Sequence, residues 1–227
     1  MTEKQKAEPM KVVKTDSVSE IKAEPTTEER ILKAAEAEFM NKGFDGARTT
    51  IIAQNAGVTH AMFHYYFRTK KNLFERIVAE KAKALQGLII STLRGSTQPL
   101  KERLKSAICN HLDFLAKNPD LPRFLIMEIY TDRERMDTLL SQFAGLASAV
   151  IGELQMEIDA CAAKGDCRKV DARMLMLDII SLNMFSFLAS PVVNVIMNGE
   201  MEADLTKFID ERKKENVETL LNRLKMS

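Results

Sequence analysis

The feature that most constrains this chain is a pair of short helical segments separated by a glycine, within residues 49–67. Thr49 or Thr50 can cap the first segment, because a threonine hydroxyl accepts a hydrogen bond from a free amide of the first helical turn. Gly57 is expected to end that segment, where a tight turn favours the positive φ that glycine adopts without strain. The second segment follows over residues 59–67. Two short helices joined this tightly are typical of a helix-turn-helix unit.

The second of these segments is predicted to have one packing face and one presented face. At about 100° per residue, Phe63, Tyr66 and Phe67 share one arc of a helix. The nearly opposite arc and its edges hold the other side chains, which are Ala61, His64 and Tyr65, flanked by His60 and Met62. A helix that enters a DNA groove needs an inner face that packs and an outer face that reaches the bases.

Helices are predicted on both sides of this unit. Thr26 and Glu29 have the spacing of a capping box, and an apolar stripe follows them as far as Gly43. From Lys70 onward, apolar repeats at helical spacing predict helices over 70–93, 100–116, 122–130, 132–163, 171–188 and 202–224. Pro191 is expected to break or kink the chain between the last two. No strand-like alternation persists, so the sequence predicts an all-α fold of about nine helices.

The composition narrows the class of protein. The apolar fraction of 45% and the charged fraction of 29% are ordinary for a globular protein. We expect neither a membrane span nor a signal peptide, because no apolar run approaches roughly 18 residues and the N-terminus is polar. Cys109, Cys161 and Cys167 fit neither a disulfide framework nor a zinc site. They are interpreted as loop or core cysteines in a reducing cytoplasm, with a redox switch at Cys161 and Cys167 as the alternative.

Charge is distributed unevenly, although the net charge is only +1. From Gly46 to Lys71 there are four basic residues and no acidic residue. An island of this kind favours phosphate binding, with a solvated basic face as the alternative. Residues 1–25 are polar, lack periodicity and carry five lysines and five acids. We interpret them as a flexible tail rather than as an arm that binds DNA.

Four motifs occur between residues 28 and 74, and their order and spacing match one known domain without an insertion or deletion. They are Arg30-Ile31-Leu32-x-Ala34-Ala35, Phe39-x3-Gly43-Phe44, Thr49-Thr50-x-Ile52-Ala53-x2-Ala56-Gly57-Val58 and Tyr66-Phe67-x2-Lys70-x2-Leu73-Phe74. This stretch resembles the DNA-binding domain of the TetR family of transcriptional regulators. The resemblance implies a helix-turn-helix domain over 26–72 and a C-terminal helical ligand-binding and dimerisation domain over 73–227.

The resemblance also implies which residues contact DNA. Arg48, Thr49 and Thr50 lie at the start of the supporting helix, where hydroxyls and free amides hold phosphates. Lys70 opens the next helix at another phosphate. The residues expected along the groove are His60, Ala61, Met62, His64, Tyr65 and Tyr66. His64 stands where the family usually has tyrosine, and Ala61 stands where glycine or another small residue is common, so the operator sequence does not follow from the resemblance.

Further residues are assigned to a ligand site and a dimer interface. Methionine suits an adaptable apolar pocket, with core packing as the alternative, so Met127 and Met174 are ligand candidates together with Asp178. Asp178 and Asn183 are polar residues of an apolar helix that bond across an interface, hold a ligand or face water. The resemblance implies a homodimer built from the last two long helices, with interface residues Asn183, Phe187, Leu220, Leu221 and Leu224.

The function implied is a sequence-specific DNA-binding regulator, a repressor that an unknown small-molecule effector releases from a palindromic operator, without a cofactor. Two alternatives stay open: an enzyme in the helical domain, and a non-specific architectural DNA-binding protein. The sequence carries no recognisable phosphate loop, nucleophile elbow or acid–base constellation. His60, His64 and His111 lack the spacing of metal ligands. We therefore expect neither catalysis nor a metal site.

Overall fold

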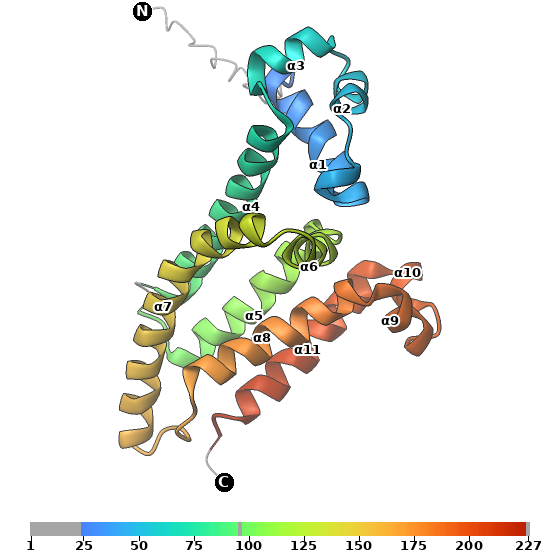
Figure 1. The fold of residues 1–227 in the computed structure, drawn as a ribbon. Helices are drawn as coiled ribbons and strands as arrows, with labels where there is room; N and C mark the ends of the chain where they lie inside the picture. The colour runs from blue at the N-terminus through green and yellow to red at the C-terminus, as the bar shows by residue number, and fades with distance from the viewer. Residues whose placement is uncertain (1–23, 95–96, 226–227) are drawn as a thin grey trace, which may run out of the picture.

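The computed structural model describes residues 24–94 and 97–225, and within them it contains eleven α-helices and no strand. The prediction of an all-α fold is confirmed. Helices α1 (Thr27–Gly46), α2 (Thr49–Asn55) and α3 (His60–Phe67) form a group at one end of the molecule (Figure 1). From that group, α4 (Lys70–Leu93) runs to the remaining helices and so connects the two parts of the chain. The tail predicted over residues 1–25 lies outside the described residues, except for its last two positions.

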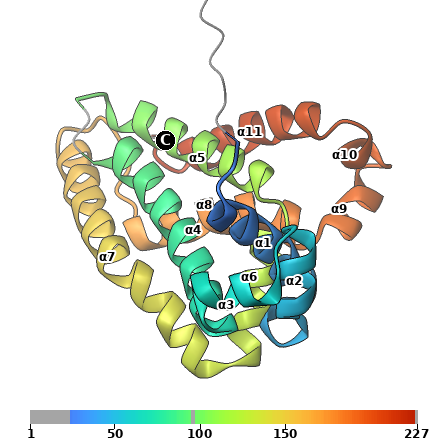
Figure 2. The ribbon, with the colours of Figure 1, turned by 90° about the horizontal axis from the view of Figure 1, so that it is seen from above.

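The other helices gather around α5 (Leu100–Lys117). This helix packs against α4, α8 (Ala172–Leu188) and α11 (Leu205–Asn222). The remaining helices are α6 (Leu121–Thr131), α7 (Arg133–Ala163), α9 (Ser190–Ile196) and α10 (Glu200–Ala203). Seen from above, α7 and the short pair α9–α10 lie at opposite edges of this group (Figure 2).

The chain between α8 and α11 contains two short helices that the sequence did not predict. Pro191 lies in the first turn of α9, where its missing amide proton and fixed φ are tolerated, whereas inside a continuous helix both would break the ladder. The axis therefore bends by 86° between α8 and α9. Within the described residues no single helix is long and apolar enough to cross a membrane. The bent pair of α8 and α9 reaches that length and apolar composition only when the two helices are taken together.

The core of the first group extends into the second. Its largest fully buried side chains come from α1, α2, α3 and the start of α4, and they are Ile31, Phe39, Ile52, Phe63 and Leu73. Phe124 of α6 belongs to the same cluster, and the centre of its ring lies 5.7 Å from that of Phe74 on α4. Because protein cores are closely packed, a shift of α6 acts directly on the N-terminal helices. The domain boundary at residue 72 stays a prediction.

The C-terminal core corrects the dimer interface proposed from the sequence. Asn183, Phe187, Leu220 and Leu224 are each at most 4% exposed within a single chain, and Leu221 packs partly buried against the same core. The apolar side of α11 faces α5 and α8 of its own chain, so this side is not available to a partner. The apolar stripes of these helices were identified correctly, but they pack against other helices of the same chain.

Cys161 near the end of α7 and Cys167 in the loop that follows correct the interpretation of these two cysteines. Cys161 and Cys167 form a disulfide, with their Cα atoms 5.6 Å apart. That separation lies within the usual range of about 4.4–6.8 Å. Cys109 is free, and burial raises the pKa of its thiol.

Candidate functional site

The position of α3 is fixed by two buried rings, one capping hydrogen bond and a glycine turn. Phe63 is 0% exposed and Phe67 is 7% exposed, so both anchor the inner face of α3 in the N-terminal core. Thr59 caps the helix, because its Oγ1 accepts a hydrogen bond from the Met62 amide at 3.2 Å. Gly57 has a φ of +65°, which lets the chain turn sharply between α2 and α3. The sequence therefore specifies a rigid support for the outer face.

The outer face of α3 is exposed and both polar and aromatic. The side chains on it are His60, Ala61, Met62, His64, Tyr65 and Tyr66. Tyr65 is 82% exposed. Tyr66 shares the arc of Phe63 on a helical wheel, yet it is 41% exposed and its ring makes an edge contact with Tyr65 at 5.3 Å. Its contact with DNA stays a prediction. Both tyrosines are available to a partner outside the chain.

Each of the two histidines on this face has one ring nitrogen engaged by a neighbouring residue. His60 Nε2 lies 3.1 Å from Thr49 Oγ1, which joins α3 to the start of α2. His64 Nδ1 lies 2.9 Å from the carbonyl oxygen of Arg68, a residue with a φ of 58°. A carbonyl only accepts, so Nδ1 donates and Nε2 of the neutral His64 ring is an acceptor. In the major groove the matching donors are the amino groups of adenine and cytosine.

Lys70 has a different set of partners from the one that the sequence suggested. Its Nζ donates to the backbone oxygens of Phe44 at 2.8 Å, Ala47 at 3.1 Å and Asp45 at 3.5 Å, and it lies 4.6 Å from the centre of the Phe44 ring. Its three donors therefore all have carbonyl partners at the end of α1. Lys70 is a structural link between α1 and α4, and its contact with a phosphate stays a prediction. Arg48 and Thr50, by contrast, are exposed beside α2.

Glu128 on α6 is a site residue that the sequence did not reveal. It is 2% exposed, and its Oε1 accepts a hydrogen bond of 2.8 Å from the amide of Phe44. Gly43 precedes that amide with a φ of 68°, so the chain bends here and exposes an amide that the helix does not use. A lone glutamate in the apolar segment 122–130 was the available signal. Glu128 and Lys70 hold Phe44 from two sides, which ties α6 and α4 to the end of α1.

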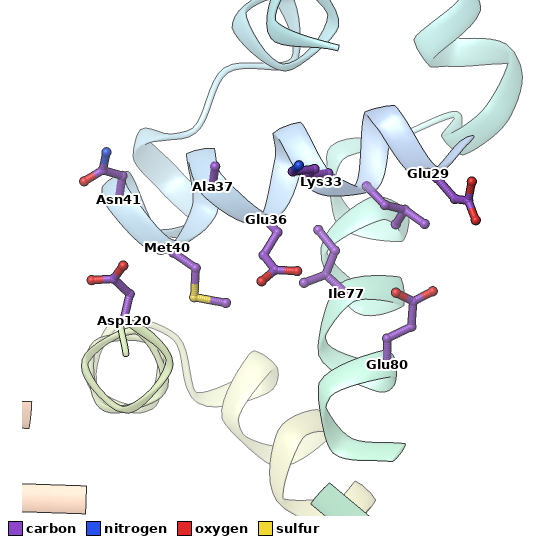
Figure 3. Close-up of a pocket in the computed structure, with 10 residues that line it drawn as sticks. Glu29, Lys33, Glu36, Ala37, Met40, Asn41, Ile77, Glu80 and Asp120 are labelled. Atoms are coloured by element: carbon purple, nitrogen blue, oxygen red, sulfur yellow. The ribbon is translucent and has the colours of Figure 1, made fainter. Parts of the chain in front are cut away.

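A polar hollow of about 720 Å³ lies beside this junction, between α1 and α4 (Figure 3). The acidic residues that line it are Glu29, Glu36, Glu80 and Asp120. Lys33 also lines the hollow, and Lys81 Nζ pairs with Glu36 Oε1 at 2.7 Å. Arg76 pairs with Glu80 at 2.8 Å and Arg123 pairs with Asp120 at 3.5 Å, so these carboxylates also have cations beside them, and the hollow belongs to the domain junction.

A second cavity, of about 260 Å³, lies within the C-terminal helices and is almost entirely apolar. Its walls come from α4, α5, α7 and α8, and they include Ile89, Val150, Met176 and Ile179. The ligand candidates chosen from the sequence do not line it. Met127 and Met174 are about half exposed elsewhere, and Asp178 pairs with Arg223. The methionine that does line the cavity is Met176, whose position on α8 faces α4 and α7.

The described residues contain no group of three His, Cys, Asp or Glu side chains that could hold a metal ion. His60 and His64 lie on the outer face of α3, whereas His111 lies in α5 and lines the apolar cavity.

Two family models match the chain. One is described as "Bacterial regulatory proteins, tetR family" and matches residues 31–77, and the other as "Tetracyclin repressor-like, C-terminal domain" and matches residues 101–219. The chain is 30% identical over 139 residues to the "Probable HTH-type transcriptional regulator YttP" of Bacillus subtilis, which covers 58% of this chain and 67% of that protein. It is 25% identical over 160 residues to the nucleoid occlusion factor SlmA of Haemophilus influenzae, which covers 70% and 72% of the two chains.

The fold is also similar to that of solved structures. The transcriptional regulator FadR from Bacillus subtilis, solved in complex with stearoyl-CoA, superposes with a TM-score of 0.59 over 86% of this chain and 98% of FadR, at 18% identity. The C-terminal model alone spans more than half of the sequence, and the N-terminal model covers the helices that build and support the exposed face of α3. The chain therefore belongs to the TetR family of bacterial transcriptional regulators.

Proposed function

We propose that this protein is a ligand-responsive repressor that binds a palindromic operator as a homodimer. The observation that carries the proposal is the outer face of α3, which presents His60, Met62, His64 and Tyr65 while Phe63 and Phe67 hold the helix in the core. A short helix supported in this way fits the major groove, where each base pair has its own pattern of donors and acceptors. Such a regulator acts where the DNA is, in the cytoplasm.

The contacts with DNA divide into two classes. On α3, His60 and Met62 at the start of the helix and His64 further along are long enough to reach base edges, and Ala61 lets the helix approach closely. Arg48, Thr49, Thr50, Tyr65, Tyr66 and Lys70 surround them and are assigned to the backbone and groove wall. Phosphate contacts fix the position of the protein, whereas base contacts provide its specificity.

The homodimer is proposed to form through the exposed apolar side of α8 and α9, in place of the residues that were first assigned. Met174, Leu177, Phe185 and Leu188 follow one side of α8 at helical spacing, and each is at least 37% exposed. Val192, Val195 and Ile196 continue this surface onto α9, with exposures of 54–77%. A contiguous apolar surface of this kind marks an interface rather than a solvated face. A two-fold dimer places two copies of α3 about 34 Å apart, one turn of DNA.

The apolar cavity is the proposed effector site. It is bounded by α4, which begins at the DNA-binding helices, and α5, α7 and α8 complete it. A ligand that favours one position of α4 therefore changes the spacing of the two copies of α3. Couplings of this kind are typically about 1–3 kcal/mol and are reciprocal, so DNA lowers ligand affinity by the same factor. FadR, which shares this fold, was solved in complex with stearoyl-CoA, and this supports a small-molecule effector for the present chain as well.

Selection of bound fragments from random duplexes at ~150 mM salt tests the proposal, because salt sets the strength of non-specific binding. The expected result is a palindromic consensus, with a specificity ratio over random DNA of roughly 10³ or more. A ratio near one would point to an architectural DNA-binding protein instead. A turnover screen with aromatic and lipid-like substrates tests the enzyme alternative.

Two kinds of variant test the division of roles. Met62→Ala is expected to cost ~1–3 kcal/mol of affinity for the operator and much less for random DNA, because it removes a base contact. Arg48→Ala is expected to weaken binding to all duplexes alike and to lower the salt slope by about one, because it removes a phosphate contact. Tyr130→Ala, on an exposed residue of α6, is the matched control.

A further inference from the structure

The apolar cavity contains little that can interact with a polar ligand. Its lining includes no charged side chain, and the polar side chains that reach it are Thr92 and His111. Thr92 Oγ1 donates to the carbonyl oxygen of Leu88 in its own helix at 2.7 Å, so its proton is already used. His111 is therefore the side chain that decides which polar group a ligand can carry.

A chain of hydrogen bonds between α11, α8 and α5 determines which nitrogen of His111 carries the proton. Arg212 Nη2 donates to Asn216 Oδ1 at 2.8 Å, and Asn216 Nδ2 donates to Asn183 Oδ1 at 2.8 Å. Asn183 Nδ2 then lies 3.0 Å from the carbonyl oxygen of Ile108 and 3.2 Å from His111 Nδ1.

The direction of this chain is fixed at both ends. The Arg212 guanidinium only donates and the Ile108 carbonyl only accepts, so neither amide can be reversed without losing a hydrogen bond. Asn183 and Asn216 are 0% and 2% exposed, and a buried amide without its hydrogen-bond partner destabilises the fold. Asn183 therefore donates to His111 Nδ1, which leaves the proton of the neutral ring on Nε2. No hydrogen-bond partner of Nε2 is found among the described residues.

The charge state of the ring agrees with this assignment. Burial lowers the pKa of His111 to about 4, so the imidazole is neutral at physiological pH. The cavity then offers one N–H donor and no positive charge. A carboxylate ligand would be buried there without a cation, which disfavours its binding.

We propose that this cavity binds a neutral, mainly apolar molecule with a single hydrogen-bond acceptor, such as a ketone, ester or lactone carbonyl, and that the acceptor bonds to Nε2–H of His111. The volume of about 260 Å³ holds about nine water-sized groups at roughly 30 Å³ each, so the fitting ligand has about that number of non-hydrogen atoms. This inference rests on the proposed role of the protein as a ligand-responsive regulator, and it names the chemical class of the effector.

Titration calorimetry of the full chain at pH 7.5 with three related probes tests the inference. Propiophenone carries a carbonyl, butylbenzene carries none, and 3-phenylpropanoate carries a carboxylate. The ketone is expected to bind about 2–12-fold more tightly than the hydrocarbon, which corresponds to one net hydrogen bond. The carboxylate is expected to bind more weakly than either. Equal affinities for ketone and hydrocarbon, or a carboxylate that binds as tightly as the ketone, would overturn the inference.

Two variants separate the hydrogen bond from the shape of the cavity. His111→Phe keeps a ring but removes the donor, so the difference between ketone and hydrocarbon is expected to vanish while butylbenzene still binds. His111→Gln restores a donor and is expected to restore part of the difference, which also guards against a His111→Phe chain that fails to fold. A difference that survives in His111→Phe would refute the role of His111. If none of the probes binds while selection still returns a palindromic operator, the assigned ligand class is wrong and the DNA-binding function stands.

Discussion

The hydrogen bond between Glu128 and Phe44 gives the sharpest test of how the two parts of the chain are joined. Glu128→Ala removes the side chain that accepts a hydrogen bond from the Phe44 amide. Glu128 is only 2% exposed. A buried amide without a partner costs about 1–3 kcal/mol, and the lost bond to a charged acceptor lies at the upper end of that range. We therefore expect the free energy of unfolding to fall by about 2–3 kcal/mol.

Glu128→Gln is the matched variant, because the side-chain carbonyl of glutamine still accepts from the Phe44 amide. It is expected to cost less than about 1 kcal/mol. Urea denaturation followed by far-UV circular dichroism measures both variants, with Met127→Ala as the control at an exposed neighbour, expected within about 0.5 kcal/mol of the parent. If the alanine and glutamine variants unfold with the same free energy, the amide of Phe44 does not depend on Glu128 and the reasoning fails.

Three further outcomes are expected. The pKa of His111 is about 4 in the folded chain and near 6.5 when unfolded, so the unfolded state binds more protons between these values, and the free energy of unfolding falls by at most about 3 kcal/mol as pH drops from 6.5 to 4. In urea denaturation as a function of pH, His111→Phe should lose that part of the slope, and an unchanged slope would contradict the assignment. Leu177→Glu, at a residue that is 54% exposed, should give a 25.6 kDa monomer in sedimentation velocity, whereas Tyr130→Glu at another exposed residue should leave a dimer. Mass spectrometry after alkylation without reductant should find Cys161 and Cys167 unmodified, and labelling of both would contradict the disulfide.

The N-terminal half of the molecule was predictable because its signals are local. The capping box at Thr26 and Glu29 forms as its spacing indicates, and the Thr26 amide donates to Glu29 Oε2 at 2.8 Å. Gly57 adopts the positive φ that the turn requires. The helical wheel placed Tyr66 on the packing face of α3, but this residue is exposed. The small core buries a narrower arc of this eight-residue helix than the arc over which its apolar residues are spread. Nearby residues in the sequence fix caps and turns, but the width of the buried face depends on what packs against it.

The C-terminal half was less predictable because periodicity shows that a side is apolar but not which surface covers it. Leu220 and Phe187 look like interface residues on a helical wheel, yet α5 takes up that side within the chain and leaves Leu177 and Phe185 outside. The same ambiguity misplaced the ligand site. Met174 and Met176 are two positions apart on α8, and the rotation of the helix alone puts the second in the cavity and the first on the surface. The chemistry of that cavity depends on partners that come from distant parts of the chain. His111 becomes a neutral donor because Asn183, 72 residues away, presents its amide to Nδ1, and no local pattern in the sequence encodes that contact.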